Sequence, residues 1–144
     1  KLIENFFLAF LRFFPAEFSK IFTLKFLKLL YYLRLIRFFS AQQDASSKEI
    51  VLGNLFFKNR IGIAGGLDKN AEYFHIFGSL GFGFIEVGTI TLEPQKGNPK
   101  PRIFRFPNDK TLVNSLGFNN SGSVKALKNI KWWFFIGDDC RLGK

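Results

Sequence analysis

The stretch Arg60-Ile-Gly-Ile-Ala-Gly-Gly-Leu-Asp-Lys-Asn70 decides how the rest of the chain is interpreted. Its apolar start predicts a short buried strand. Gly65 and Gly66 lack a Cβ, so the backbone there can adopt unusual dihedral angles and approach a ligand closely. Asp68 and Lys69 follow where the strand opens into a loop, which is the end at which α/β folds bind ligands. The same letters also fit an ordinary Gly-Gly turn with a solvated Asp-Lys pair.

The next segment predicts a βαβ unit. Residues 71–80 have a helical apolar spacing, Gly81-Phe82-Gly83 ends that helix, and residues 84–90 form a second, mostly apolar strand. Strand, helix and strand within about 30 residues imply parallel strands. Thr89 then stands at the end of the second strand, level with Gly66 at the end of the first. Thr89 is also an ordinary strand former, so its identity alone does not assign it to a site.

An asparagine-rich run follows a stiff connection. Residues 92–102 contain three prolines, which excludes a helix and predicts a long ordered connection. A short strand is expected at 103–106 and a turn at 107–109. Residues 112–122 carry no charge but hold Asn114, Asn119 and Asn120, whose amides suit a planar ring of alternating carbonyl and N–H groups. A turn with a helix cap is the alternative interpretation. We expect a helix at 123–133 and a further strand from 133 to 136.

Residues 1–43 form a helical segment of distinct composition. Pro15 separates two helices that each carry a broad apolar face, and a break or third short helix is expected near residues 31–33. The longest uncharged run has seven residues, whereas a bilayer span needs about 20. The aromatic and basic faces fit a helix pair lying on a membrane surface, and equally a helical hairpin packed on the following domain. A polar linker is expected at 40–50.

Composition limits the remaining possibilities. The chain has 144 residues, 47% of them hydrophobic and 22% charged, which predicts a globular domain. The formal charge of +10 favours anionic partners. Nucleic acid is not expected, because the phenylalanines are spaced like core residues. Cys140 is the single cysteine, and the single histidine, His75, is expected to be a surface or packing residue, so a metal centre is not expected.

Four motifs together resemble one enzyme family. They are residues 64–70, residues 81–91 (Gly-Phe-Gly-Phe-Ile-Glu-Val-Gly-Thr-Ile-Thr), residues 94–105, and Asn114-Ser-Leu-Gly-Phe-Asn-Asn120. In this order and at these separations they resemble class 2 dihydroorotate dehydrogenase, the membrane-associated, quinone-using type. The leading helices, including residues 14–17 before the second helix, also resemble that class.

The resemblance implies a fold and a function. The fold is α/β, with an N-terminal helical pair (1–43, for membrane and quinone access) and the first part of a (β/α)₈ barrel that binds FMN (44–144). The enzyme would oxidise dihydroorotate to orotate in pyrimidine biosynthesis and reduce a quinone. It would lie peripherally on the cytoplasmic side of a bacterial inner membrane, or on the mitochondrial inner membrane in a eukaryote. A non-enzymatic basic module that binds membrane or nucleic acid is the alternative.

Matching positions imply the site residues. Arg105 resembles the arginine near the quinone entry, and Lys69 would reach both cofactor and substrate. The residues lining the FMN would be Gly65, Gly66, Leu67, Asp68, Lys69 and Thr89. The near wall of the substrate pocket would be Asn114, Ser115, Leu116, Gly117 and Phe118.

The chain also departs from the family. A complete barrel needs roughly 250 residues, so we expect a truncated and inactive piece of the enzyme. The family's catalytic serine base and most of its phosphate contacts would lie beyond residue 144, so no catalytic base is assigned. The residues after Gly137 are Asp-Asp-Cys instead of the family's Gly-x-Asn-x-Gly-Lys, which suggests a truncated or frame-shifted product.

Overall fold

The computed structural model describes residues 7, 9–38 and 49–137, and at residues 37 and 133–137 it describes the backbone alone. Two predictions fall outside the described residues, namely the linker after residue 40 and the departure after Gly137. The same holds for Cys140 and for the boundary between residues 43 and 44.

The helical segment has the predicted two helices and break. Residues 9–12 are helical, and Pro15 precedes α2 (Ala16–Tyr32). The hydroxyl of Ser19 donates to the Leu11 carbonyl oxygen at 2.8 Å, which joins the two helices. The 3₁₀ helix η1 (Leu35–Phe38) follows a turn in which Arg34 has a φ of 60°. None of the described helices has an apolar stretch long enough to cross a bilayer.

A hairpin precedes the central strands. β1 (Ile50–Leu52) pairs antiparallel with β2 (Leu55–Phe57), with Gly53 at a φ of 61° in the turn. A residue with a Cβ is strained at that angle, which is why glycine suits the turn.

The βαβ unit is present with shorter elements than predicted. β3 (Gly62–Ile63) pairs in parallel with β4 (Phe84–Ile85), and α3 (Phe74–Ser79) connects them. The predicted start of the helix at residue 71 is wrong, because residues 64–73 form a loop in which Ala71 has a φ of 55°. The predicted strand 84–90 is also too long, since pairing leaves the regular ladder after Ile85.

Two further predictions are corrected near the C-terminal end. The start of the asparagine-rich run is a strand, β6 (Thr111–Asn114), which pairs antiparallel with β5 (Ile103–Phe106). The strand expected at 133–136 is wrong, because α4 (Gly122–Gly137) continues as one helix through those positions. Aromatic and branched residues favour strands only weakly, and here the helix that precedes them simply extends.

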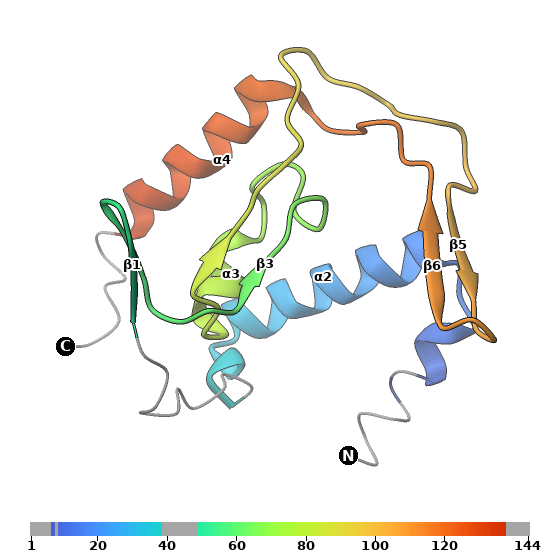
Figure 1. Cartoon of the computed structure of the whole chain (residues 1–144), viewed down its shortest axis with the longest axis horizontal. Helices are drawn as coiled ribbons and strands as arrows, with labels where there is room; N and C mark the ends of the chain where they lie inside the picture. Colours follow the sequence, from blue (N-terminus) through green and yellow to red (C-terminus); the bar gives the residue numbers. More distant parts are fainter. Residues whose placement is uncertain (1–6, 8, 39–48, 138–144) are drawn as a thin grey trace.

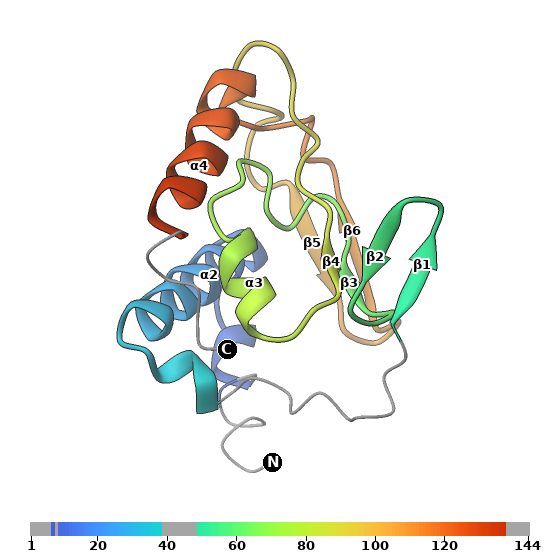
Figure 2. The same cartoon turned by 90° about the vertical axis from the view of Figure 1, so that its left-hand side faces the viewer.

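The elements are arranged around α2. Figure 1 shows α2 running beneath β3 and toward the β5–β6 hairpin, with α4 on the far side of the central strands. Figure 2 shows the β1–β2 hairpin standing apart from α2 and α3. The described strands form three separate two-stranded sheets, so within this part of the chain no barrel is closed. Among the described residues, the buried apolar ones are Leu24, Ile36, Ala71, Ile76, Phe77 and Ala126.

Candidate functional site

The tips of β3 and β4 lie side by side, as the sequence predicted. The backbone N–H of Gly66 donates to the Gly88 carbonyl oxygen at 2.6 Å, and the N–H of Gly88 donates to the Asp68 carbonyl oxygen at 3.0 Å. Gly66 has a φ of 97° and Gly88 a φ of 119°, angles that favour glycine at both tips. The parallel pair therefore brings the diglycine loop next to Thr89.

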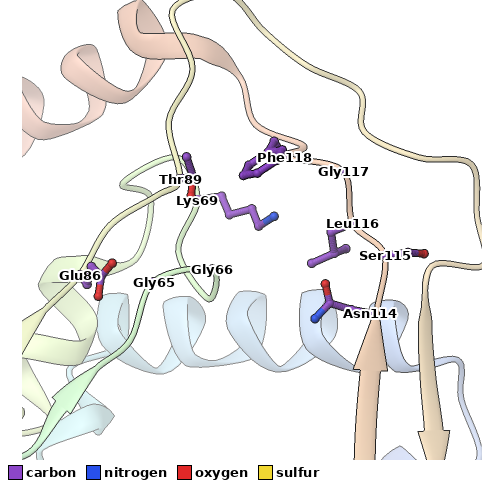
Figure 3. Close-up of a pocket in the computed structure, with 10 residues that line it drawn as sticks. All are labelled: Gly65, Gly66, Lys69, Glu86, Thr89, Asn114, Ser115, Leu116, Gly117 and Phe118. Atoms are coloured by element: carbon purple, nitrogen blue, oxygen red, sulfur yellow. The ribbon is translucent and has the colours of Figure 1, made fainter.

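A pocket of about 460 Å³ lies between these tips and the chain that follows β6. Figure 3 shows the diglycine loop and Thr89 on one side and the 114–118 segment on the other, with the Lys69 side chain extending between them. All lining residues except Glu86 were predicted site residues. The lining residues are Gly65, Gly66, Lys69, Glu86, Thr89, Asn114, Ser115, Leu116, Gly117 and Phe118.

Lys69 places a cation inside this pocket. Its Nζ donates to the Asn119 Oδ1 at 3.0 Å, so the side chain is held across the space between the two walls. Burial, and next the positive charge of Arg102, lower the pKa of Lys69 below its ordinary value. A partly buried ammonium group with a neutral partner is suited to a ligand that carries or gains negative charge.

The opposite wall is fixed by the proline-rich connection. The N–H of Asn98 donates to the Leu116 carbonyl oxygen at 3.1 Å, and its side-chain amide donates to the Ser115 carbonyl oxygen at 2.7 Å. Gly117 has a φ of 68°, and a Cβ there would lie 2.8 Å from the Asn98 nitrogen. In Figure 3 the side chains of Asn114 and Leu116 point toward the pocket, whereas that of Ser115 points away from it.

Three predicted site residues do not line the pocket. The carboxylate of Asp68 is buried and accepts hydrogen bonds from the backbone N–H groups of Glu72 (2.9 Å) and Tyr73 (2.7 Å). Its side chain therefore shapes the loop that leads into α3. Arg105 donates from Nη1 to the Phe14 carbonyl oxygen at 2.8 Å and so holds the end of the first helix. Leu67 is half-buried beside the diglycine.

Sequence reasoning missed several residues that build the site. A Cβ on Gly65 would lie 2.8 Å from the Glu86 carboxylate, so the glycine makes room for that side chain. Asn120, which the sequence pointed to as an amide for a planar ring, instead serves the backbone: it is buried, accepts from the N–H of Gly122 at 2.9 Å and donates to the Phe118 carbonyl oxygen at 2.6 Å. Lys20 of α2 is another missed residue, since its Nζ donates to the Gly66 carbonyl oxygen at 2.9 Å. No local pattern distinguishes such a lysine from a solvated one.

The lining defines the chemistry that the pocket supports. It offers backbone amides, one ammonium group, the carboxylate of Glu86, amide and hydroxyl side chains and few bulky groups near the diglycine. Among the described residues, no group of His, Cys, Asp and Glu side chains could hold a metal ion. The arrangement suits a flat, polar, anionic ligand lying on the two strand tips.

The comparisons with known proteins point to one family. The family model described as dihydroorotate dehydrogenase matches residues 48–135. A dihydroorotate dehydrogenase (quinone) from Neisseria meningitidis is 44% identical over 122 residues, which cover 85% of this chain and 35% of that protein. A protein of the same name from Acinetobacter baylyi is 47% identical over 96 residues, covering 67% of this chain and 29% of the relative.

Solved structures show the same likeness. The crystal structure of DHODH in complex with ferulenol from Eimeria tenella matches with a TM-score of 0.76 and 36% sequence identity, covering 91% of this chain and 34% of that one. The chain spans about a third of the length of the curated relatives it matches. Its mixed α/β fold with an N-terminal helix thus corresponds to part of that structure. Because the family model covers more than half of the sequence, this chain belongs to the dihydroorotate dehydrogenase family.

Proposed function

We propose that this chain supplies the helical segment and the first part of the (β/α)₈ barrel of a quinone-dependent dihydroorotate dehydrogenase. In this proposal residues 1–43 give access to membrane and quinone, and residues 44–144 begin the barrel. The observation that carries the proposal is the position of Lys69, which extends between the two strand tips and the 114–118 wall. The reaction would be oxidation of dihydroorotate to orotate, with a quinone as the final electron acceptor.

The residues around the diglycine fit FMN. A flat ring needs a surface free of side chains, and Gly66, which has no atom within 4 Å of a Cβ position, provides one where the β3 tip meets Gly88. Thr89 adds a hydroxyl group at the neighbouring tip. We infer that Gly65, Gly66 and Thr89 line the cofactor directly. Leu67 and Asp68 would contribute through the backbone, since the Asp68 carboxylate is engaged with the amides of Glu72 and Tyr73.

Lys69 and the 114–118 wall would organise the reaction. FMN, when bound, supplies the acceptor for a hydride from the substrate. Lys69 would hold positive charge beside that acceptor and beside the substrate carboxylate, in a partly buried site where charge interacts more strongly than in water. Asn114 would orient the amide ring of the substrate by donating and accepting hydrogen bonds. Leu116 and Phe118 would close the pocket against water.

The helical segment would meet the membrane and the quinone. Phe18, Phe22 and Phe26 form a row on α2, with ring centroids 6.3 and 6.4 Å apart along it, and each is more than a third exposed. Lys25 on the same helix is exposed too. An exposed aromatic row with nearby lysine suits peripheral contact with an anionic bilayer. Arg105 would act on this side by holding the first helix against β5.

Binding of FMN to the purified chain tests the proposal. Flavin fluorescence should fall on titration and reach saturation at one FMN per chain. Lys69→Ala should weaken binding about tenfold, because it removes a charge-assisted contact, and Lys125→Ala, which changes an exposed lysine of α4, should leave it unchanged. Equal affinities of the Lys69→Ala and Lys125→Ala variants would contradict the role given to Lys69, and no saturable binding would show that this chain does not hold FMN without the phosphate contacts expected beyond residue 144.

A further inference from the structure

Two charged residues of α2, one turn apart, are linked to the two opposite walls of the pocket, Lys20 directly and Glu17 through Arg102. The carboxylate of Glu17 accepts from Arg102 at 2.7 Å (Nη2) and 3.2 Å (Nε), and the Lys20 Nζ donates to the Gly66 carbonyl oxygen at 2.9 Å. Residues spaced by three lie on one face of a helix. Figure 3 shows α2 passing beneath both the diglycine loop and Asn114.

The hydrogen bond from Lys20 helps to hold the wall of the pocket that contains Gly65 and Gly66. The N–H of Gly66 is bound by the tip of β4 through Gly88, and the carbonyl group of the same residue is bound by Lys20. Both polar groups of this residue are thus held, one by the sheet and one by the helix. Burial lowers the pKa of Lys20, which agrees with an ammonium group that is largely removed from water.

The contact of Glu17 reaches the other wall through Arg102. This guanidinium group is 7% exposed and also donates from Nη1 to the carbonyl oxygens of Lys96 (2.8 Å) and Asn98 (3.1 Å). Asn98 donates hydrogen bonds to the carbonyl oxygens of Leu116 and Ser115. The N–H of Ser115 in turn donates to the Arg102 carbonyl oxygen at 3.0 Å. A continuous set of hydrogen bonds therefore runs from Glu17 to the 114–118 wall.

We propose that Glu17 and Lys20 are positioning residues that set the separation of the two pocket walls, so that α2 is a structural part of the pocket. The two walls belong to separate sheets, β3–β4 and β5–β6. Beyond the strand ends, the isolated antiparallel bridge of Gln95 with Asn120 joins the two segments, and the N–H of Thr91 donates to the Asn120 Oδ1 at 3.2 Å. Lys69–Asn119 and Asn70–Ser121 hydrogen bonds join the walls on the side away from α2. Glu17 and Lys20 supply the connection on the α2 side. The identity of the ligand rests on the function proposed above, whereas the fixation of the walls does not.

Amide hydrogen exchange of the purified chain, followed by NMR, tests the proposal without any ligand. The amides of Gly66 and Gly88 report on the first wall, and those of Asn98 and Ser115 on the second, because all four are hydrogen-bonded. Lys20→Met should raise exchange at the first pair about tenfold and leave the second pair within about twofold. Glu17→Gln should raise exchange at Asn98 and Ser115 about tenfold and leave Gly66 and Gly88 within about twofold. Lys20→Arg should restore protection, and Lys25→Met serves as the control from the exposed face of α2.

The outcomes separate positioning from general destabilisation. The Leu80 amide, bonded to the Ile76 carbonyl oxygen at 3.1 Å, reports on α3, which neither residue contacts through a hydrogen bond in the described part of the chain. Faster exchange at the expected wall with Leu80 unchanged supports the proposal. Unchanged exchange, or an equal rise at both walls and at Leu80, overturns it.

FMN affinity provides the functional readout. Both Lys20→Met and Glu17→Gln should weaken FMN binding about tenfold, whereas Lys25→Met should not change it. If the unaltered chain binds no FMN but the exchange pattern is found, this chain does not hold FMN on its own and the positioning proposal stands. If all variants bind FMN with equal affinity and the amides of both walls exchange at the rates of the unaltered chain, the positioning proposal fails and the cofactor proposal stands.

Discussion

Replacing Asp68 distinguishes a structural carboxylate from a cofactor ligand. The side chain is 1% exposed, and its two oxygens accept from the N–H groups of Glu72 and Tyr73 at 2.9 and 2.7 Å. Asp68→Ala would leave both amides buried without this acceptor. A charge-assisted hydrogen bond contributes about 1.5–3 kcal/mol, and partial access of water to the vacated space reduces the sum. We expect the free energy of unfolding to fall by about 3 kcal/mol.

Asp68→Asn refines the test. Its carbonyl oxygen still accepts from one amide, but its NH₂ group faces the other N–H, so the expected loss is about 2 kcal/mol. Asp109→Ala, in the exposed β5–β6 turn, is the matched control and should change stability by less than about 0.5 kcal/mol. Urea unfolding followed by far-UV circular dichroism gives these differences.

The same variants reveal any direct contact with FMN. If the Asp68 side chain serves only the loop, FMN affinity of the folded protein should change less than stability does. An unfolding midpoint of Asp68→Ala equal to that of the unaltered protein, together with greatly weakened FMN binding, would refute this reasoning. It would then place the carboxylate in contact with the cofactor.

Three further predictions concern other parts of the molecule. Burial lowers the pKa of His75 to about 4 from an ordinary 6.5. The neutral imidazole should therefore contribute its full share of the free energy of unfolding above pH 6.5, and this share should be lost as the pH falls to about 4. Its magnitude is about 1–3 kcal/mol after allowance for solvent screening, and urea titrations of His75→Phe should lack this loss. Arg105→Met should lower the melting temperature by a few degrees through loss of its bond to Phe14, and an unchanged value would contradict that role. Phe18→Ser with Phe22→Ser should reduce co-sedimentation with anionic vesicles severalfold, whereas Leu52→Ser in the β1–β2 hairpin should not.

The features that the sequence predicted well are those that depend on local chemistry. A diglycine after an apolar strand and a Gly-Thr pair after the next one place ligand-binding backbone at neighbouring tips, because parallel strands end at the same edge. The structure has this pairing, with Gly66 bonded to Gly88. It also brings Asn114 to the same pocket. The motif order that resembled dihydroorotate dehydrogenase led to the same residues.

The features that the sequence could not supply depend on distant contacts. Lys20 and Gly66 are 46 residues apart, and Glu17 and Arg102 are 85 apart. Nothing in a helical pattern tells which lysine or glutamate of a polar face is buried against a later segment. The expectation of a packing role for His75 was correct, since its ring lies 5.0 Å from that of Tyr31.

Propensity alone also failed where a neighbouring element decided the outcome. β6 was not predicted, because its sequence is part of an uncharged asparagine-rich run. It forms because β5 offers a pairing partner across a four-residue turn. The aromatic end of α4 was predicted as a strand, but residues up to Gly137 continue the helix. Secondary structure follows such tertiary context more closely than it follows the preference of single residues.

The most direct test of the account is an NMR titration of the purified chain with FMN, in which backbone amides are followed individually. The account predicts saturable shifts at Gly66 and Thr89 on one wall and at Leu116 and Gly117 on the other, with a common dissociation constant. Shifts confined to other surfaces, or to one wall alone, would contradict a flat cofactor resting on both strand tips.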